Sequence, residues 1–296
     1  MNKSSKILVI LNPAARSEKA SAMREKILAL SPRLAVWMTE SPGDARVLAQ
    51  RAVHQGFETV VAAGGDGTVN EVVNGLAGAD VRFGILPVGT MNVFATELGI
   101  SSNLSKAWEV IEAGNCRLID LAKANEEYFV QLGGVGLDAA VVQSTTPDSK
   151  KNLGPLSYLI TLAQVVARKP PELLIEPVDG PARKGSFVLV GNGRLYGGPF
   201  VLFKDARIDD GLLDVLVFEN QSHWDIMRYV QAIAFGNHSE LPDVQYFQTR
   251  GLRLSCEEYV PVELDGELCG HLPYEFGFSN RKLSVLAPEP PEVAGT

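Results

Sequence analysis

The chain has 296 residues, of which 46% are hydrophobic and 21% charged, a composition typical of a folded globular protein and a length that favours two domains. The formal net charge of −8 argues against a nucleic-acid partner, because phosphate backbones are bound by clustered Lys and Arg. Three scattered cysteines without a Cys-x-x-Cys pair predict free thiols in a reducing cytoplasm, and no segment is apolar for long enough to span a membrane.

Strand-like and helix-like segments alternate over the first 120 residues. The helix candidates have apolar residues at spacings of three and four, and they start near residues 20, 44, 69, 91 and 105. The strand candidates are short apolar runs at 6–11, 34–38, 59–63 and 82–86. This alternation predicts a doubly wound, mostly parallel α/β domain over residues 1–120.

After about Asp120 the pattern changes to short strands separated by turn residues, which predicts an antiparallel β-rich domain over 121–296, a sandwich or a barrel. The strand candidates are 128–132, 173–175, 187–190, 213–218 and 252–255. Only two helices are expected, Pro155 to Ala167 and His223 to Phe235. The large side chains of the second helix are interpreted as core, with a lipid-facing surface as the alternative; they are Trp224, Met227, Tyr229 and Phe235.

The sharpest local motif is Gly64-Gly65-Asp66-Gly67-Thr68, which joins a strand candidate to a helix candidate. Clustered glycines at such a junction let backbone N–H groups approach an anion closely, and the helix N-terminus adds a favourable potential. Thr68 can add a hydroxyl donor, and Asp66 can meet a Mg²⁺ ion on nucleotide phosphates. A tight turn that needs glycine for positive φ is the alternative, which the added carboxylate and threonine disfavour.

A second glycine turn, Pro87-Val88-Gly89-Thr90-Met91-Asn92, follows the strand candidate at 82–86. The carboxyl ends of parallel strands share one edge of a sheet, so both turns are expected to line one nucleotide-binding crevice; an unrelated loop is the alternative. The sequence contains neither a Gly-x-x-x-x-Gly-Lys-[Ser/Thr] loop nor a dinucleotide fingerprint with its acidic partner. A phosphate site of either type is therefore not expected.

Motifs along nearly the whole chain occur in the order of one known family. In the first half these are Asn12-Pro13, 61–76 and 86–98. In the second half they are Gly134-Val135-Gly136-Leu137-Asp138-Ala139, 192–198, 206–213 and Leu264-Asp265-Gly266-Glu267. Together they resemble the catalytic domain of the diacylglycerol kinase, sphingosine kinase and ceramide kinase family, and most of all its soluble bacterial lipid kinases. The resemblance implies an α/β domain of the phosphofructokinase and NAD kinase type, followed by an antiparallel β-sandwich.

The resemblance also implies roles for individual residues. Glu267 matches the general base for the lipid hydroxyl, Asp66 the ligand of the catalytic Mg²⁺, and Asp265 and Asp120 the surrounding acidic network. A separate structural Mg²⁺ would be held by Asp210 and by the backbone carbonyls of Arg207 and Leu212. The implied nucleotide-contacting residues are Thr39, Gly64, Gly65, Asp66, Gly67, Thr68, Asn70, Gly89, Thr90 and Asn92.

The resemblance predicts an ATP- and Mg²⁺-dependent lipid kinase with its active site between the two domains. The expected acceptor is a diacylglycerol- or sphingoid-like lipid, met at the membrane surface by a cytoplasmic protein with peripheral contact to the inner face. The resemblance also allows a homodimer. One departure concerns the second turn, where many bacterial members have Asp after the asparagine and this chain has Val93 after Asn92.

Three alternatives stand beside the lipid kinase. Asp265-Gly266 can be an exposed hairpin turn, because Asp-Gly is a common turn dipeptide. NAD kinases share the Gly-Gly-Asp-Gly-Thr motif but are expected to have an Asn-Glu pair well downstream of it, whereas the only pairs here are Asn70-Glu71 and Asn125-Glu126. A regulator that binds nucleotide without catalysis would be expected to lose some of the acidic residues, which are all present.

Overall fold

The computed structural model describes residues 7–13, 18–32, 34–137, 139–140, 170–198 and 200–289. The chain forms two compact units, of which the first runs to Ile119 and resumes at Arg281, and the second covers Asp120–Asn280. The sequence pattern divides the chain near residue 120 and leaves open whether the last strand returns to the first domain. In the structure it does return, because the end of strand β18 (Tyr274–Leu286) pairs with strand β4 (Arg82–Pro87) of the first unit.

The first unit contains the predicted parallel sheet, in the order β2-β1-β3-β4 followed by the end of β18. Strand β3 is buried along its whole length, and β1 is buried at four of its five residues, because helices cover both faces of a parallel sheet. The continuous apolar runs in the sequence reflect this burial. The remaining bounds are β1 (Ile7–Leu11), β2 (Leu34–Met38) and β3 (Thr59–Gly64).

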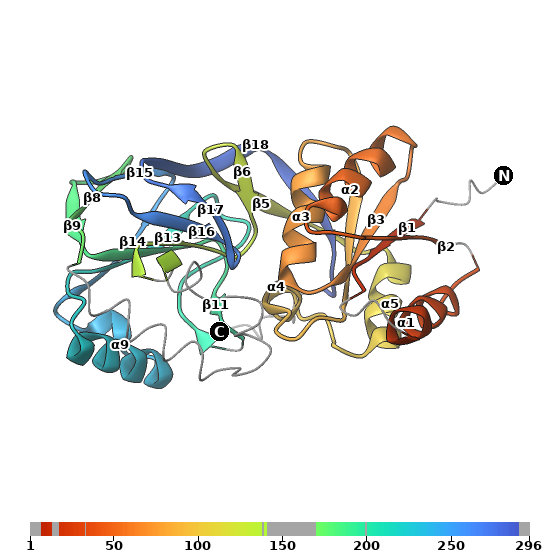
Figure 1. The fold of residues 1–296 in the computed structure, drawn as a ribbon, viewed down its shortest axis with the longest axis horizontal. Helices are drawn as coiled ribbons and strands as arrows, with labels where there is room; N and C mark the ends of the chain where they lie inside the picture. The colour runs from red at the N-terminus through yellow and green to blue at the C-terminus, as the bar shows by residue number, and fades with distance from the viewer. Residues whose placement is uncertain are drawn as a thin grey trace. The chain divides into compact units, whose positions relative to one another are not determined.

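Five helices accompany this sheet, with α2 and α3 on one face and α1 and α5 on the other (Figure 1). Helix α5 is capped at both ends: the Asn103 side chain accepts the amide of Lys106 at 3.1 Å, and Gly114 ends the helix at φ 74°. The helices are α1 (Glu18–Leu28), α2 (Asp44–His54), α3 (Asp66–Leu76), α4 (Val93–Glu97) and α5 (Leu104–Ala113).

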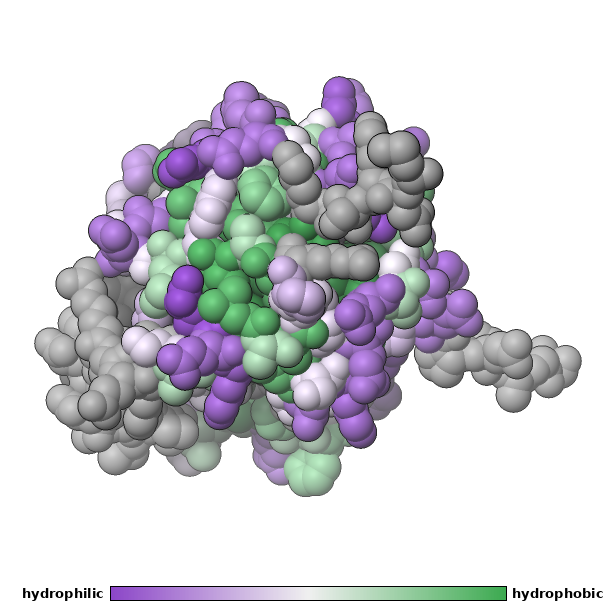
Figure 2. All heavy atoms as spheres, turned by 90° about the vertical axis from the view of Figure 1, so that its right-hand side faces the viewer, coloured by the Kyte–Doolittle hydropathy of each residue, from purple (hydrophilic) through white to green (hydrophobic). Residues whose placement is uncertain are grey.

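Strand β2 forms the edge of the parallel sheet, and all five of its residues are apolar but none is fully buried. Figure 2 looks onto the side where Figure 1 draws β2, and apolar side chains gather there within a polar surround. Phe57 packs edge-on against Trp37 at 5.6 Å, and the Arg51 guanidinium lies 4.9 Å from the same ring. These contacts cover part of an edge that would otherwise expose a flat apolar strand.

The second unit is the predicted antiparallel β-sandwich. One layer is a six-stranded sheet in the order β14-β13-β10-β7-β16-β17. The other layer contains β8, β9, β15 and the first part of β18, and apolar residues from both layers form one core. Further strands are β5 (Cys116–Ala124), β6 (Glu127–Phe129), β7 (Leu132–Val135), β8 (Leu173–Pro177), β9 (Arg183–Gly185), β10 (Phe187–Gly191), β11 (Leu195–Tyr196), β12 (Phe200–Val201), β13 (Leu213–Phe218), β14 (Val244–Thr249), β15 (Leu252–Ser255), β16 (Pro261–Leu264) and β17 (Glu267–His271).

Three element predictions in this unit have different outcomes. The segment 128–132 is not one strand, because β6 ends at Phe129 and β7 begins at Leu132. The helix predicted from His223 to Phe235 is confirmed as α9. The helix predicted from Pro155 to Ala167 lies outside the described residues. No helix in the described ranges is long and apolar enough to cross a membrane.

Helix α9 (His223–Phe235) packs on the outer face of the six-stranded sheet through Ile226 and Tyr229. A capping box begins it: the Ser222 hydroxyl accepts the Asp225 amide at 3.2 Å, and the Asp225 carboxylate accepts the Ser222 amide at 3.0 Å. The core interpretation holds for Tyr229 and is wrong for the other three residues, because Trp224, Met227 and Phe235 lie on the exposed side.

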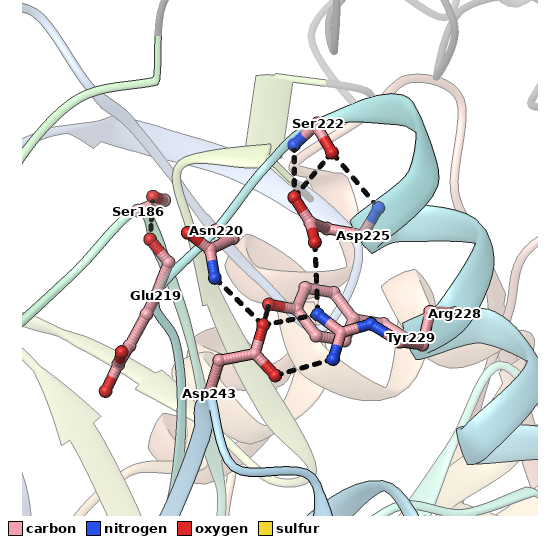
Figure 3. A network of polar contacts seen from close by, with 8 residues as sticks. All are labelled: Ser186, Glu219, Asn220, Ser222, Asp225, Arg228, Tyr229 and Asp243. Carbon is pink, nitrogen blue, oxygen red and sulfur yellow. Dashed lines mark hydrogen bonds and ion pairs between the residues drawn. The ribbon is translucent and has the colours of Figure 1, made fainter.

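A network of charged and polar side chains fastens α9 to the segment before β14 (Figure 3). The buried Asp243 carboxylate accepts hydrogen bonds from Asn220 at 2.9 Å, from Tyr229 at 2.6 Å and from both terminal nitrogens of Arg228. Arg228 also donates to Asp225 at 3.0 Å. Burial alone would raise the pKa of Asp243, but these donors outweigh it and lower the pKa to about 2.

We expect this network to make the free energy of unfolding depend on pH in the acid range. Because the folded-state pKa of Asp243 lies below the ordinary 3.8, its contribution of about 2 kcal/mol is present above about pH 4 and is lost as the pH falls toward 2. Urea unfolding of wild type and Asp243→Asn should therefore differ at pH 7 and converge in acid. The exposed Asp80→Asn is the control. A gap between wild type and Asp243→Asn that stays constant with pH would contradict the assignment.

Candidate active site

The first glycine turn lies where the buried strand β3 meets helix α3. Gly65 is the N-cap residue of α3 in an extended conformation (φ −93°, ψ −169°), and no side chain of the described residues caps the helix there. The first N–H groups of a helix have no partner within it, so they are available to an anion. Gly64 must be glycine, because a Cβ atom there would lie 2.4 Å from the Cβ of Thr68.

The second glycine turn meets the first through the backbone. The amides of Val88 and Gly89 both donate to the Gly64 carbonyl at 3.2 Å. A Cβ atom on Gly89 would lie 2.3 Å from the Cα of Gly65 and 2.8 Å from its nitrogen. Asn92, at φ 51°, closes the second turn by accepting the Gly89 amide at 3.1 Å and donating to the Gly89 carbonyl at 2.9 Å. The expectation that the two turns share one edge is therefore confirmed.

Gly89→Ala is expected to push the two turns apart, because the two nearest atoms that a Cβ would strike belong to the Gly65 backbone and cannot rotate away. We expect a loss of about 1–3 kcal/mol in the free energy of unfolding and at least a tenfold weaker binding of ATP. Calorimetric melting and fluorescence titration with ATP would measure both. Gly277→Ala is the matched control, because its nearest atom would be a carbonyl oxygen at 3.8 Å. Wild-type ATP affinity in Gly89→Ala would contradict the prediction.

Asp66 is the acidic group of this turn and is half-buried at the start of α3. Its carboxylate accepts the amide of Phe94 at 3.3 Å, so it connects the first turn to the helix that follows the second turn. Burial raises the pKa of Asp66, and backbone donors at Phe94, Val93 and Asn92 oppose that rise. A half-buried carboxylate at a helix N-terminus without a side-chain cap suits a hard cation carried by phosphates.

Three threonines and two asparagines lie at or next to this edge of the parallel sheet. Thr39 follows β2, is buried, and its amide donates to the Leu11 carbonyl at 3.0 Å. The Thr68 hydroxyl accepts the side-chain amide of Asn12 at 2.9 Å, so Asn12 orients that hydroxyl. Thr90 is exposed in the second turn. Asn70 lies one turn into α3, where its side-chain and main-chain oxygens accept the amide group of Asn74 at 3.0 Å.

Sequence reasoning did not select Asn12 or Glu71 as site residues. Asn12 directly follows β1, and the argument about the shared carboxyl edge could have identified it. The Glu71 carboxylate accepts the amides of Gly43 and Ala45 at 2.8 and 3.0 Å, and so holds the start of α2 beside α3. That contact depends on how two helices pack, which the sequence pattern does not reveal.

In the second unit, Asp265 and Gly266 form the two-residue turn between β16 and β17. Both have positive φ, 50° and 86°, as a type I′ turn requires. The hairpin alternative is therefore correct as geometry. The Asp265 carboxylate also accepts the amides of Val130, Gln131 and Leu132 at 2.9, 2.9 and 3.0 Å. These bonds divert the amides of 130–132 from a strand ladder and explain the break between β6 and β7.

Asp265→Ala is expected to destabilise the second unit, because three amides lose a charged acceptor. Hydrogen bonds to a charged group contribute about 1.5–3 kcal/mol each and are not additive, so we expect a loss of about 3 kcal/mol in urea unfolding. Glu126→Ala is the control, since its carboxylate is 92% exposed in a surface ion pair with Lys123. Lost activity with wild-type stability would instead give Asp265 a purely catalytic role.

Glu267 is the first residue of β17 and is exposed. No described residue forms a hydrogen bond or ion pair with its carboxylate. The turn that Asp265 anchors fixes the backbone immediately before Glu267. The backbone of Glu267 therefore has a defined position, while its side chain is exposed to solvent. This arrangement leaves the carboxylate available to accept a proton.

Asp120 is buried, and its carboxylate accepts the Gly211 amide at 2.7 Å. It thereby holds the turn Asp210-Gly211-Leu212, in which Gly211 has φ 74°. Asp210 is exposed, and its carboxylate accepts the Leu212 amide at 3.0 Å. Arg207 is exposed beside Asp209 at 3.4 Å. The structure thus brings Asp120 to the predicted metal-binding turn.

The surroundings of this turn fit a cation. Within the described ranges no three His, Cys, Asp or Glu side chains are grouped to hold a metal, but the implied site uses one carboxylate and two carbonyls. The neighbouring Asp214 is fully buried, and one of its carboxylate oxygens has no hydrogen-bond partner. Burial raises the pKa of Asp214 to about 6, and the charges of Asp210 and Asp205 add to the rise. Oxygen ligands and unneutralised negative charge are what Mg²⁺ favours.

Comparisons with known proteins agree for both units. Residues 6–124 match the sequence profile of the diacylglycerol kinase catalytic domain. Residues 133–287 match the profile of the YegS C-terminal NAD kinase beta sandwich-like domain. The second match covers the β-sandwich, and the first covers both glycine turns.

Individual relatives and solved structures extend this similarity over most of the chain. Proteins named diacylglycerol kinase from Staphylococcus aureus strains JH9 and Newman are 33% identical over 257 residues, which cover 85% of this chain and 81% of each relative. A structure of a diacylglycerol kinase from Bacillus anthracis str. Sterne superimposes with a TM-score of 0.78 at 27% identity, covering 96% of this chain and 97% of that one. A second structure from the same organism gives a TM-score of 0.80 at 27% identity and covers 96% and 95%. The chain therefore belongs to the diacylglycerol kinase family and is an ATP-using phosphotransferase that acts on an alcohol group.

Proposed function

We propose that this protein is a Mg²⁺-dependent kinase that transfers the γ-phosphate of ATP to the free hydroxyl of diacylglycerol. One observation carries the proposal: the two glycine turns touch backbone to backbone at Gly65 and Gly89, and the Asp66 carboxylate bonds to the helix beyond the second turn. Such an arrangement offers amide donors and one carboxylate to a chain of phosphates. It meets the main demand of phosphoryl transfer, which is positioning with charge neutralisation.

The first unit would bind the nucleotide. The amides of Gly65 and Gly67 and the Thr68 hydroxyl, oriented by Asn12, would donate to phosphate oxygens. Asp66 would hold the catalytic Mg²⁺, which supplies positive charge against the phosphates when bound. The partial burial of Asp66 supports this role, because electrostatic interactions are stronger away from bulk water.

The second unit would handle the proton. In the reaction the lipid oxygen forms a bond to the γ-phosphorus, the bond from that phosphorus to the ADP oxygen breaks, and the hydroxyl proton passes to the Glu267 carboxylate. Asp265 would act as a positioning residue, since its carboxylate is occupied by three backbone amides. Asp120 would likewise position the turn at Asp210, where a second Mg²⁺ would have a structural role.

Diacylglycerol is proposed as acceptor because the relatives that cover most of this chain bear the name diacylglycerol kinase. A sphingoid base is the second candidate. The residue Val93 is the reason to retain a sphingoid base as a candidate acceptor. Many bacterial members of the family have a carboxylate at this position beside the second turn, and this chain lacks it. The use of ATP supports action at the cytoplasmic face of a membrane.

Radiolabelled phosphate transfer from ATP would test the proposal. Diacylglycerol, monoacylglycerol, sphingosine, ceramide and phosphatidylglycerol would each be presented in mixed micelles, with and without Mg²⁺. We expect label in diacylglycerol that disappears when Mg²⁺ is chelated. Label in sphingosine alone would replace the acceptor, and label in no lipid despite ATP binding would contradict the kinase proposal.

A further inference from the structure

Helix α9 presents a continuous apolar face to solvent. Trp224 is 80% exposed, Met227 64%, Val230 55% and Phe235 77%. At 3.6 residues per turn these four side chains lie within about 140° of arc around the helix. The opposite side, with Ile226 and Tyr229, packs on the sheet. Large apolar residues on this scale are rarely left exposed together without a binding role.

The exposed face carries no Asp, Glu, Lys or Arg side chain. Its remaining exposed members are His223, Gln231 and Ala234. The two charged residues of α9, Asp225 and Arg228, bond to each other, and Arg228 also bonds to Asp243 (Figure 3). The face can therefore leave water without dehydrating an unpaired charge, which is the main cost of placing a helix in a lipid interface.

The apolar surface continues beyond the helix. Strand β12 contacts α9 and carries Phe200, which is 51% exposed. An aromatic residue stands at each end of the helix, Trp224 in its first turn and Phe235 at its last residue. Aromatic side chains favour the boundary between headgroups and acyl chains.

We propose that α9 is a membrane-docking helix that lies in the interface of a lipid bilayer, with Trp224, Met227, Val230 and Phe235 among the acyl chains. This inference rests on the proposed function, whose acceptor resides in a bilayer. The net charge of −8 gives no general attraction to an anionic surface, so apolar insertion has to supply the affinity. Docking should therefore depend little on anionic lipid or on salt.

A second copy of the chain fits this face less well. A 13-residue helix is about 20 Å long and about 10 Å wide, so its face covers about 200 Å². Stable protein–protein interfaces bury about 800 Å² on each partner. A bilayer needs no such complementary area, because each inserted side chain is transferred independently.

Vesicle binding tests the docking helix without relying on activity. The probe is phosphatidylcholine vesicles, with or without diacylglycerol or phosphatidylglycerol, and the readouts are co-sedimentation and quenching of tryptophan fluorescence by brominated lipid. The variant is Trp224→Gln/Met227→Gln/Phe235→Gln. The matched control is Val47→Gln/Leu118→Gln/Val178→Gln, whose side chains are 60%, 61% and 69% exposed elsewhere on the surface.

We expect the helix variant to lose at least about tenfold in vesicle partitioning, because three apolar side chains leave the lipid, while the control binds as wild type. The rate at which the helix variant phosphorylates monomeric short-chain diacylglycerol should equal that of wild type. Wild-type partitioning of the helix variant would overturn the proposal, and so would a change in oligomeric state by sedimentation velocity without loss of vesicle binding. If wild type phosphorylates no diacylglycerol but Trp224 is still quenched by vesicles, the proposed function fails and the docking helix stands.

Discussion

Asp66→Asn should reduce kcat for lipid phosphorylation by about a thousandfold while the protein remains folded. The substitution keeps the size and shape of the side chain, and its amide oxygen can still accept the Phe94 amide that Asp66 accepts at 3.3 Å. What it removes is one negative charge and the ability to bind a hard cation strongly. The substitution therefore separates the structural contribution of Asp66 from its electrostatic contribution. The hydrogen bond that joins the two turns is kept, and the negative charge is removed.

Three measurements on Asp66→Asn distinguish the roles of the carboxylate. Circular dichroism melting should match wild type, ATP binding without Mg²⁺ should be retained, and the dependence of the rate on Mg²⁺ concentration should weaken. Asp80→Asn, an exposed substitution just before β4 in the same unit, should change none of these. Wild-type kcat in Asp66→Asn would remove Asp66 from the catalytic site. A lower melting temperature would instead assign it a structural role.

The first unit was predictable because local signals and the global fold agree. Continuous apolar runs predict buried strands, and the rule that parallel strands end at one edge predicts from the sequence that the turns of Gly65 and Gly89 lie together. The contact between Gly65 and Gly89 itself needed the structure. Periodicity cannot show that two backbones approach until a Cβ atom would no longer fit.

The second unit contains features that sequence patterns do not predict. Residues 128–132 have the composition of a strand, but Asp265, distant in sequence, takes up the amides that a strand ladder would use. Helix α9 was predicted with its correct bounds, but periodicity alone did not show which apolar residues face the sheet. Tyr229 and Trp224 look alike in the sequence, and only packing reveals that one is buried and the other exposed. The return of β18 to β4 likewise depends on long-range pairing.

Glu267→Gln should reduce kcat for lipid phosphorylation by about 10² to 10⁴, the range that a general base typically contributes. Glu267 is exposed and no described residue bonds to its carboxylate, so an isosteric amide should leave the free energy of unfolding unchanged. This distinguishes it from Asp265, two residues earlier, whose loss should unfold the hairpin region. A large fall in rate at constant stability is the signature of a group that acts on the reaction and not on the fold.

The comparison of kcat with KM gives the sharper test of Glu267. If its carboxylate accepts the hydroxyl proton, Glu267→Gln should lose most of its kcat for lipid phosphorylation. The KM for ATP should stay near wild type, because the proposed nucleotide contacts all lie in the first unit. Glu257→Gln, another exposed glutamate of the second unit, should behave as wild type throughout. Wild-type kcat in Glu267→Gln would mean that another group takes the proton, and the search would then turn to the acidic residues around Asp120.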